Sequence, residues 1–269
     1  MNIYMAIMNR RFLISSNDEQ VVSYIQGAYS GYICNGNCAS RNIKRIDADH
    51  LLEQNTGTDK ETIVDNAIVN SINSHEQYYF LLHAGVLLLD NSAFLLCGKT
   101  KSGKSTACFL LQSMYNYICI SDDLAFINKT NLRVSSIYRP VKLRAPVVKK
   151  YDLLQKVVFC EYDSNGMERY KLLTPKYDVN RSINDALVKA IIEIEYVTDE
   201  NIQSTEELNG FSAIQTLLLN SYSQDRLKDS YGVITELVKS ASIVKVKYNN
   251  PIYLNDIIVA LSKKGVRYE

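Results

Sequence analysis

The chain has 269 residues, a length that fits a single domain or a two-lobed protein with an ample core. Its 30 basic and 29 acidic side chains give a net charge of +1, so the composition shows no excess of positive charge that would indicate binding to nucleic acid or to a membrane surface. No apolar run reaches membrane-spanning length, residues 1–14 lack the apolar core of a signal peptide, and the six cysteines are expected to be reduced thiols of a cytoplasmic protein.

Residues 1–75 are predicted to form a small α+β lobe. Apolar alternation and helical periodicity predict strands at 3–8, 11–15 and about 42–46, and helices at 19–29 and 60–73. Asn17 and Asp18 offer an N-cap for the first helix. The lobe carries no cluster of side chains typical of catalysis, and His50 and His75 are expected on the surface.

The next segment, 79–89, is apolar and ends at Asp90-Asn91, a dipeptide typical of tight turns. A second apolar run, 92–97, follows directly. The two runs are expected to form a β-hairpin, which makes the second strand antiparallel to its predecessor.

The second strand leads into a stretch that fits G-x-x-x-x-G-K-[ST], the pattern of a phosphate-binding loop. Its residues are Gly98, Lys99, Thr100, Lys101, Ser102, Gly103, Lys104 and Ser105, and we expect them to bind a nucleotide together with Thr106. The two glycines allow torsions that let successive N–H groups point at phosphate oxygens. Lys104 supplies a charge for the β- and γ-phosphates, and the Ser105 hydroxyl is a ligand for Mg²⁺.

A surface turn rich in Gly, Lys and Ser is the alternative interpretation of this loop. The context favours a phosphate loop, because a buried strand precedes it and the apolar spacing of 106–115 predicts a helix after it. The N-terminal end of that helix adds partial positive charge. Lys99 and Lys101 place extra charge inside the loop, where they either contact phosphate or point outward.

Residues 117–121 predict the next strand, which ends at Asp122 and Asp123. In a strand adjacent to the loop, these carboxylates lie where Mg²⁺ and an attacking hydroxyl need them. A solvated strand end is the alternative. The pair follows Lys104 after only one helix and one strand, which disfavours motor and GTPase-type loops. Kinases built like shikimate kinase also have early aspartates, but they lack the hairpin.

Together, His83-Ala84, residues 98–106 and Ser121-Asp122-Asp123 resemble the catalytic core of HPr kinase/phosphorylase. The similarity is closest to its shorter relatives, which include the kinases that accompany lasso and other ribosomal peptide precursors. The resemblance implies an α/β fold with a P-loop kinase core at 76–269, of the type shared with the C-terminal half of phosphoenolpyruvate carboxykinase. The small α+β lobe at 1–75 precedes it.

The resemblance also implies roles for individual residues. ATP is the donor and Mg²⁺ the cofactor, Asp122 is the general base, and His83 orients or tunes it. Asp123 and Ser105 hold the metal, and Lys104 takes part in catalysis as well as in nucleotide binding. An exchange of roles between Asp122 and Asp123 stays open.

Basic residues follow the aspartates. Arg139 and Arg144 stand where the shorter relatives have an Arg-Pro step and a basic strand, and Arg181 lies in the polar stretch 163–184, which is expected to be a lid. The three arginines are candidates for a clamp on the triphosphate or on an acidic substrate. A solvated rim is the alternative.

The rest of the chain is expected to be mainly helical. Residues 187–197 and 243–248 predict strands, and Glu193 and Glu195 share a face of the first. Three amphipathic stripes predict helices with core positions at Leu208, Phe211, Ile214, Leu217 and Leu218, at Leu227, Tyr231, Ile234, Leu237 and Val238, and at Leu254, Ile257, Ile258 and Leu261.

The favoured function is ATP- and Mg²⁺-dependent phosphorylation of a serine or threonine in a peptide or protein, such as a ribosomal peptide precursor. The segment that HPr kinase/phosphorylase uses for phosphorolysis and for docking HPr is not found, so HPr is not the expected target. The alternatives are a kinase of a small hydroxylated molecule and a nucleotide-binding regulator without transfer. No nucleic acid or membrane is expected as a partner, and the family's habit of assembling suggests a homo-oligomer.

Overall fold

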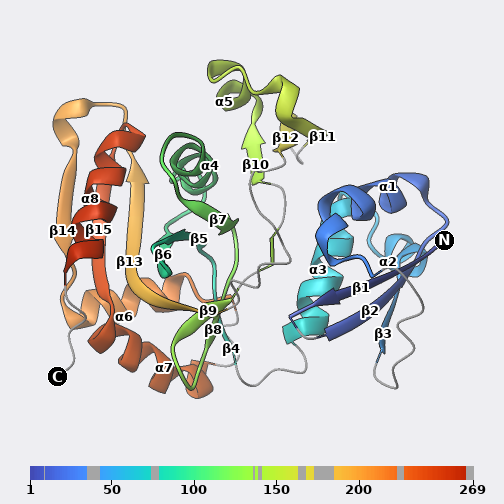
Figure 1. Ribbon diagram of the computed structural model, residues 1–269, viewed down its shortest axis with the longest axis horizontal. Coiled ribbons are helices and arrows are strands. Elements are labelled where there is room, and N and C mark those ends of the chain that lie inside the picture. Colours follow the sequence, from blue (N-terminus) through green and yellow to red (C-terminus); the bar gives the residue numbers. More distant parts are fainter. Residues whose placement is uncertain are drawn as a thin grey trace.

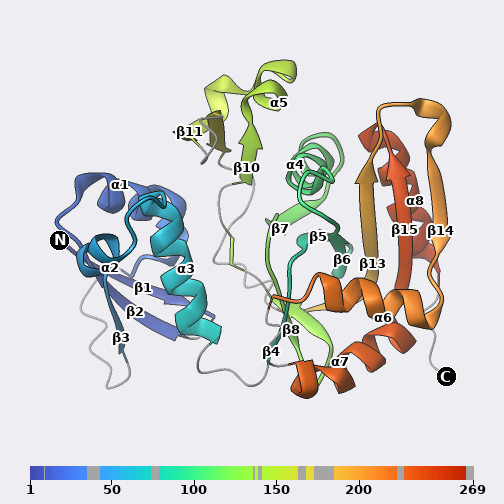
Figure 2. The ribbon, with the colours of Figure 1, turned by 180° about the vertical axis from the view of Figure 1, so that it is seen from behind.

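The computed structural model describes residues 1–8, 10–34, 43–73, 79–135, 137–138, 141–162, 168–172, 185–222 and 227–264. Within them the chain is a mixed α/β protein with a large mixed sheet and two smaller sheets (Figure 1; Figure 2). The predictions made for His75, Arg139 and Arg181 lie outside the described residues, as does most of the expected lid, of which 168–172 form a strand.

The N-terminal lobe follows the sequence prediction closely. Its three strands lie in the order β1-β2-β3, with β1 and β2 antiparallel and β2 and β3 parallel. Its elements are β1 (Asn2–Ile7), β2 (Arg10–Ser15), α1 (Glu19–Ala28), η1 (Ser30–Tyr32), β3 (Ile43–Asp47), α2 (Ala48–Gln54) and α3 (Lys60–Asn73). Asp18 caps α1 as expected, because its side chain accepts from the N–H groups of Gln20 and Val21. Helix α2, which is capped by Asp47, was not predicted.

The large sheet has nine strands among the described residues. Its path runs β4-β8-β9-β13-β6-β5-β7, and β15 joins β13 and in turn pairs with β14. The strands are β4 (Tyr79–Leu82), β5 (Gly85–Leu89), β6 (Ser92–Cys97), β7 (Ile118–Ser121), β8 (Ala125–Asn128), β9 (Arg133–Ser135), β13 (Ala186–Tyr196), β14 (Ser204–Glu207) and β15 (Ser242–Tyr248). β13 is parallel to both β6 and β15.

The predicted hairpin forms, but it involves only the second half of the run 79–89. β5 and β6 are antiparallel, and both turn residues are left-handed, with φ of 49° at Asp90 and 63° at Asn91. Positive φ at both positions is the requirement of a tight type I′ hairpin turn. The run is interrupted at His83 and Ala84, and β4 pairs with β8 instead. The break places His83 between two strands.

The strand that precedes the aspartates was expected beside β6, and this expectation was wrong. β5 lies between β6 and β7 and is antiparallel to both. The local pattern identified each strand, whereas their order depends on contacts between distant segments. β6 and β7 therefore run in the same direction one strand apart, and both end toward the same edge of the sheet.

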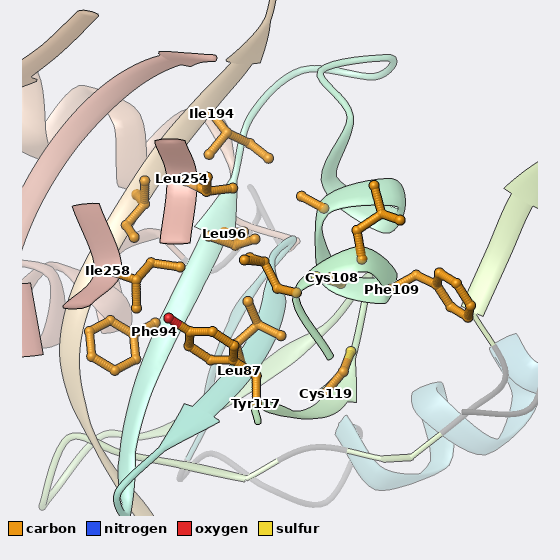
Figure 3. Packing of buried hydrophobic residues seen from close by; sticks show 14 of the residues in the cluster. Leu87, Phe94, Leu96, Cys108, Phe109, Tyr117, Cys119, Ile194, Leu254 and Ile258 are labelled. Atoms are coloured by element: carbon orange, nitrogen blue, oxygen red, sulfur yellow. The ribbon is translucent and has the colours of Figure 1, made fainter. Parts of the chain in front are cut away.

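Two layers of helices cover the two faces of the large sheet. On one face, α4 (Lys104–Met114) and α8 (Pro251–Lys263) pack on alternate residues of the central strands, and Figure 3 shows Phe94 and Leu96 of β6 meeting Leu254 and Ile258 of α8. On the other face, α6 (Gly210–Leu219) and α7 (Leu227–Ser240) pack on the intervening residues. Burial of both faces explains the nearly continuous apolar runs of these strands.

A third sheet lies beside α4. Its strands run in the order β10-β12-β11, and its elements are β10 (Val141–Arg144), α5 (Ala145–Lys150), η2 (Leu154–Lys156), β11 (Val157–Tyr162) and β12 (Glu168–Leu172). Val141 and Leu143 of β10 belong to the same buried cluster as α4. The intervening Lys142 and Arg144 are only partly buried, so β10 presents one apolar and one basic face.

The C-terminal helices were predicted correctly, but two of their expected core residues are on the surface. Phe211 is 78% exposed and Tyr231 is 60% exposed, because the buried residues of α6 are Ala213, Thr216 and Leu217 and α7 buries another face. β14 and the short turn η3 (Glu200–Ile202) were not predicted, and every residue of β14 is exposed. Among the described helices none is both long and apolar enough to cross a membrane.

Candidate active site

The loop at 98–105, which the sequence predicts to bind phosphate, has a backbone that requires its glycines. Gly98 has φ of 145° and Gly103 has φ of 93°, and Lys101 between them is also left-handed at 72°. A Cβ on Gly98 would lie 2.6 Å from the carbonyl oxygen of Ile194, and one on Gly103 would overlap the Tyr248 hydroxyl. Both torsion and space therefore exclude larger residues, as expected for a loop whose N–H groups converge.

Three segments distant in sequence hold this loop in place. The N–H of Gly98 donates to Asn220 Oδ1 at 3.1 Å, and the N–H of Tyr196 donates to the carbonyl oxygen of Ser102 at 3.1 Å. The Tyr248 hydroxyl donates to the carbonyl oxygen of Gly103 at 3.2 Å. These anchors come from the end of α6, of β13 and of β15. No sequence signal pointed to them, because each is defined only by long-range contacts.

Lys104 begins α4 and is almost fully buried. Its ammonium donates to the carbonyl oxygens of Gly98 at 2.5 Å and of Lys99 at 3.5 Å. Burial lowers the pKa of this ammonium from its ordinary value, and the negative charge of Asp123 opposes that shift. The side chain is therefore held under the loop, where a phosphate group would meet it.

One polar atom of the loop has no partner among the described residues. The hydroxyl oxygen of Ser102 is buried, and within that part of the chain it accepts from and donates to nothing. A buried hydroxyl without a hydrogen bond is costly and uncommon in proteins. Together with the positive φ of the two glycines, it indicates a loop built around a group that the protein itself does not supply. An anionic ligand with oxygen atoms fits this site.

The two aspartates differ in burial and in partners. Asp122 is buried, whereas the Asp123 side chain is 48% exposed and its Oδ1 lies 2.8 Å from His83 Nε2. Ser121 stabilises the turn that carries them, because its hydroxyl accepts from the N–H groups of Asp123 and Leu124. His83 was expected to orient Asp122, and the contact described for its ring is with Asp123.

A single cavity of about 460 Å³ brings the candidate residues together. Its wall contains the predicted residues His83, Thr100, Lys101, Ser102, Gly103, Lys104, Ser105, Thr106, Asp122, Asp123 and Arg144. Lys142 and Lys150, which belong to the basic stretch of the sequence but were not singled out as site residues, also line it, as do Tyr196 and Tyr248, which were not predicted. Gly98 and Lys99 lie in the loop and are not part of the cavity wall. The volume is within the usual range for a small ligand.

Metal binding in this cavity would depend on few protein ligands. The described residues contain no cluster of three or more His, Cys, Asp or Glu side chains that could enclose a metal. Mg²⁺ in phosphoryl-transfer sites needs no such cluster, since it is held by one or two side chains and by phosphate oxygens. Ser105 and Asp123 line the cavity and fit that requirement, whereas Glu193 accepts from the Thr216 hydroxyl at 2.7 Å and supports the fold.

Comparison with known proteins adds little to this geometry. No family model matches the chain, and no curated protein matches it. Among solved structures, the Hpr(Ser) kinase/phosphatase from Coxiella burnetii is similar, with 13% sequence identity and a TM-score of 0.31 over 68% of this chain and 98% of that chain. At this TM-score the likeness carries no argument about activity, so any functional conclusion has to rest on the arrangement of the cavity itself.

Proposed function

We propose that the protein is a kinase that transfers the γ-phosphoryl group of ATP, with Mg²⁺, to a hydroxyl group. The favoured acceptor is a serine or threonine of a peptide or protein. One observation carries the proposal: Asp122, Asp123 and His83 line the same cavity as Lys104 and the phosphate loop. A protein that only bound nucleotide would need the loop but would have no use for a histidine–carboxylate pair facing it.

The loop residues act at the donor end of the site. The N–H groups of the loop and the Lys104 ammonium bind the β- and γ-phosphates, and the Ser102 hydroxyl gains the partner that it lacks among the described residues. Ser105 and Asp123 are the residues that would hold the metal. Mg²⁺ supplies neutralisation of charge on the phosphate oxygens as the transfer proceeds.

The aspartates and His83 act at the acceptor end. Asp122 takes the proton of the acceptor hydroxyl while the hydroxyl oxygen forms a bond to the γ-phosphorus. The bond from that phosphorus to the oxygen that bridges it to the β-phosphate breaks, and ADP is released. A carboxylate accepts hydrogen bonds only, so His83 Nε2 carries the proton that is shared with Asp123. That hydrogen bond fixes the orientation of Asp123.

A small hydroxylated molecule is the second candidate acceptor. The site is a defined cavity of about 460 Å³ with Tyr196 and Tyr248 in its wall, which is typical of small-molecule sites. Both acceptor classes use the same donor loop and the same base. A peptide acceptor also needs room in the site for the chain on both sides of the reacting residue, whereas a small molecule does not.

The test of the proposal combines binding and transfer in matched variants. We expect wild-type protein to bind Mg²⁺-ATP by calorimetry and to label serine-containing peptides. Asp122→Asn should lower transfer by about 10²-fold or more, the usual contribution of a general base, while the Kd for Mg²⁺-ATP changes by less than about threefold. Asp256→Asn on the exposed face of α8 is the control and should change neither. Equal transfer by Asp122→Asn would show that Asp122 is not the base.

A further inference from the structure

The cavity contains more positive charge than the donor loop provides. Five cationic side chains line it, against the two carboxylates of Asp122 and Asp123. Two of the cations, Lys101 and Lys104, belong to the phosphate loop. The other three are Lys142 and Arg144 of β10, in the third sheet, and Lys150 of the helix α5 that follows it. A magnesium-bound triphosphate is already neutralised in part by its metal, so this second group of cations needs another explanation.

Buried apolar residues alternate with partly buried basic residues along strand β10. Val141 and Leu143 are buried in the core, and the alternating Lys142 and Arg144 are only partly buried. Lys142 and Arg144 line the cavity, and Leu143 also reaches its wall. Lys150 follows in the last turn of α5. The apolar residues therefore fix β10 against the core and set the direction of the charged ones.

Two of the three cations lack an acidic partner within the described part of the chain. Among those residues, no ion pair involves Arg144 or Lys150, while the Lys142 ammonium donates to the Thr62 hydroxyl at 3.0 Å. Lys150 lies over the ring of Tyr151, with 5.5 Å from its ammonium to the ring centroid. The guanidinium of Arg144 binds a carboxylate or phosphate through two parallel hydrogen bonds when one is present.

We propose that Arg144 and Lys150 form an acceptor subsite, which binds an anionic group carried by the acceptor close to its hydroxyl. The inference rests on the proposed kinase function and narrows its substrate class to serine or threonine peptides with a carboxylate or phosphate side chain beside the reacting residue. Lys104 and the loop amides hold the donor phosphates. Arg144 and Lys150 hold the acceptor's charge, which places the hydroxyl between the two positive regions and next to Asp122.

The first arm of the test measures peptide binding without transfer. Fluorescence anisotropy measures the Kd of three serine peptides that differ in one residue next to the serine, which is Glu, phosphoserine or Gln. Each peptide is measured with and without Mg²⁺ and a non-hydrolysable ATP analogue. We expect the two charged peptides to bind about tenfold or more tightly than the Gln peptide, as is typical of hydrogen bonds to charged groups. The ratio between the Glu and phosphoserine peptides identifies which anion is preferred. The preference should weaken with added salt.

Variants of the subsite provide the second arm. Arg144→Gln and Lys150→Gln should each abolish the preference for charged peptides, and Arg144→Lys should keep part of it. Lys149→Gln is the matched control, because Lys149 is an exposed lysine on the same helix that does not line the cavity. It should leave the preference unchanged. Thermal melts of all variants check that each is folded, and the Kd for Mg²⁺-ATP should change by less than about threefold.

Three results would overturn the proposal. The charged and neutral peptides bind equally well to the wild-type protein, or no peptide binds at all. The substitutions at Arg144 and Lys150 weaken Mg²⁺-ATP instead of the peptides, which would assign both residues to the donor site. The control at Lys149 loses the preference as fully as the others do. If the kinase proposal fails because no peptide is phosphorylated, the binding measurements still decide whether the anion subsite exists.

Discussion

Two separate features of the loop require glycine at position 103, its backbone torsion and the close approach of a neighbouring side chain. Its φ of 93° is strained for any residue with a Cβ, and the space that a Cβ would fill is taken by the Tyr248 hydroxyl. The same hydroxyl donates to the carbonyl oxygen of Gly103. Torsional strain and steric overlap are separate costs, so they can be measured separately.

We expect Gly103→Ala to lower the free energy of unfolding by about 1–2 kcal/mol from the left-handed torsion alone, and further because of the overlap with Tyr248. Tyr248→Phe removes the overlapping oxygen. The double variant should therefore recover part of the loss but keep the torsional cost. Urea denaturation of the four proteins in this cycle gives the coupling energy. Strict additivity would show that the hydroxyl does not limit the space at Gly103.

Ser102 leads to a prediction in which stability and binding change in opposite directions. Its buried hydroxyl has no partner among the described residues, so Ser102→Ala should keep or raise the melting temperature. The same change should weaken Mg²⁺-ATP binding, because the hydroxyl is available to bind a phosphate oxygen. Calorimetric titration and thermal melts measure the two effects.

Ser121→Ala is the matched control for that prediction. The Ser121 hydroxyl accepts from two backbone N–H groups, and their loss should lower the melting temperature. A fall in the melting temperature of Ser102→Ala as large as that of Ser121→Ala would show that the Ser102 hydroxyl has a structural partner.

At the scale of elements, the end of α6 joins parts of the site that come from different strands. The carbonyl oxygen of Asn220 accepts from the N–H of His83 at 2.7 Å, and its side-chain oxygen accepts from the N–H of Gly98 at 3.1 Å. Its amide group donates to the carbonyl oxygen of Thr216 within the helix. One residue therefore sets the position of the loop relative to the strand break that carries His83.

We expect Asn220→Ala to raise the Kd for Mg²⁺-ATP by about tenfold, because the N–H of Gly98 loses its acceptor and the start of the loop is no longer fixed. Asn220→Asp keeps an acceptor oxygen but loses the donor to Thr216 and adds negative charge beside the loop, so it should not restore the affinity. Asn209→Ala is the control at the opposite end of α6, where Asn209 caps the helix by accepting from the N–H of Ser212. It should lower stability by about 1 kcal/mol and leave nucleotide binding unchanged. Equal effects of the two alanine variants on nucleotide binding would contradict a special role for Asn220.

Local patterns in the sequence were enough to predict most elements and to select residues that line one cavity. The turn at Asp90 and Asn91, the loop glycines and the periodic helices depend on neighbouring residues, and each was found where expected. The insertion of β5 between β6 and β7 was missed, because the order of strands is decided by contacts between distant segments. The exposure of Phe211 was missed for the same reason: periodicity defines an apolar face, but the neighbours decide which part of it is buried.

At the scale of the whole molecule, the N-terminal lobe and the large sheet share one buried cluster. Val64, Ile68 and Ile72 of α3 belong to it together with Leu81 of β4 and Phe126 of β8. The predicted boundary between two domains lies at residues 75 and 76, within a segment outside the described residues. The shared cluster contains residues from both sides of that boundary. We therefore expect the lobe and the sheet to unfold together.

Phe126 is the residue through which this coupling can be tested. It is fully buried, and its ring packs edge-on against Tyr79 with 6.0 Å between the centroids. Scanning calorimetry of the wild-type protein should show a single transition with equal calorimetric and van't Hoff enthalpies. Phe126→Ala should lower the free energy of unfolding by about 3–5 kcal/mol and separate the transition into two.

The control for that prediction is Phe109→Ala. Phe109 is buried equally well but belongs to the cluster of α4 and α8, in which the described residues include none from the lobe. It should be destabilising without producing a second transition. Two transitions in the wild-type protein would contradict the proposed coupling.

The hydrogen bonds from Lys104 to the carbonyl oxygens of its own loop have a consequence for how tightly any ligand is held. An arriving phosphate does not meet a bare cation, because it competes for the three N–H donors with neutral oxygen atoms that already solvate the ammonium from within. The measured affinity is therefore the difference between two sets of partners, and it understates the strength of either. The same exchange lets the protein keep a charged group in its interior without a shell of water around it.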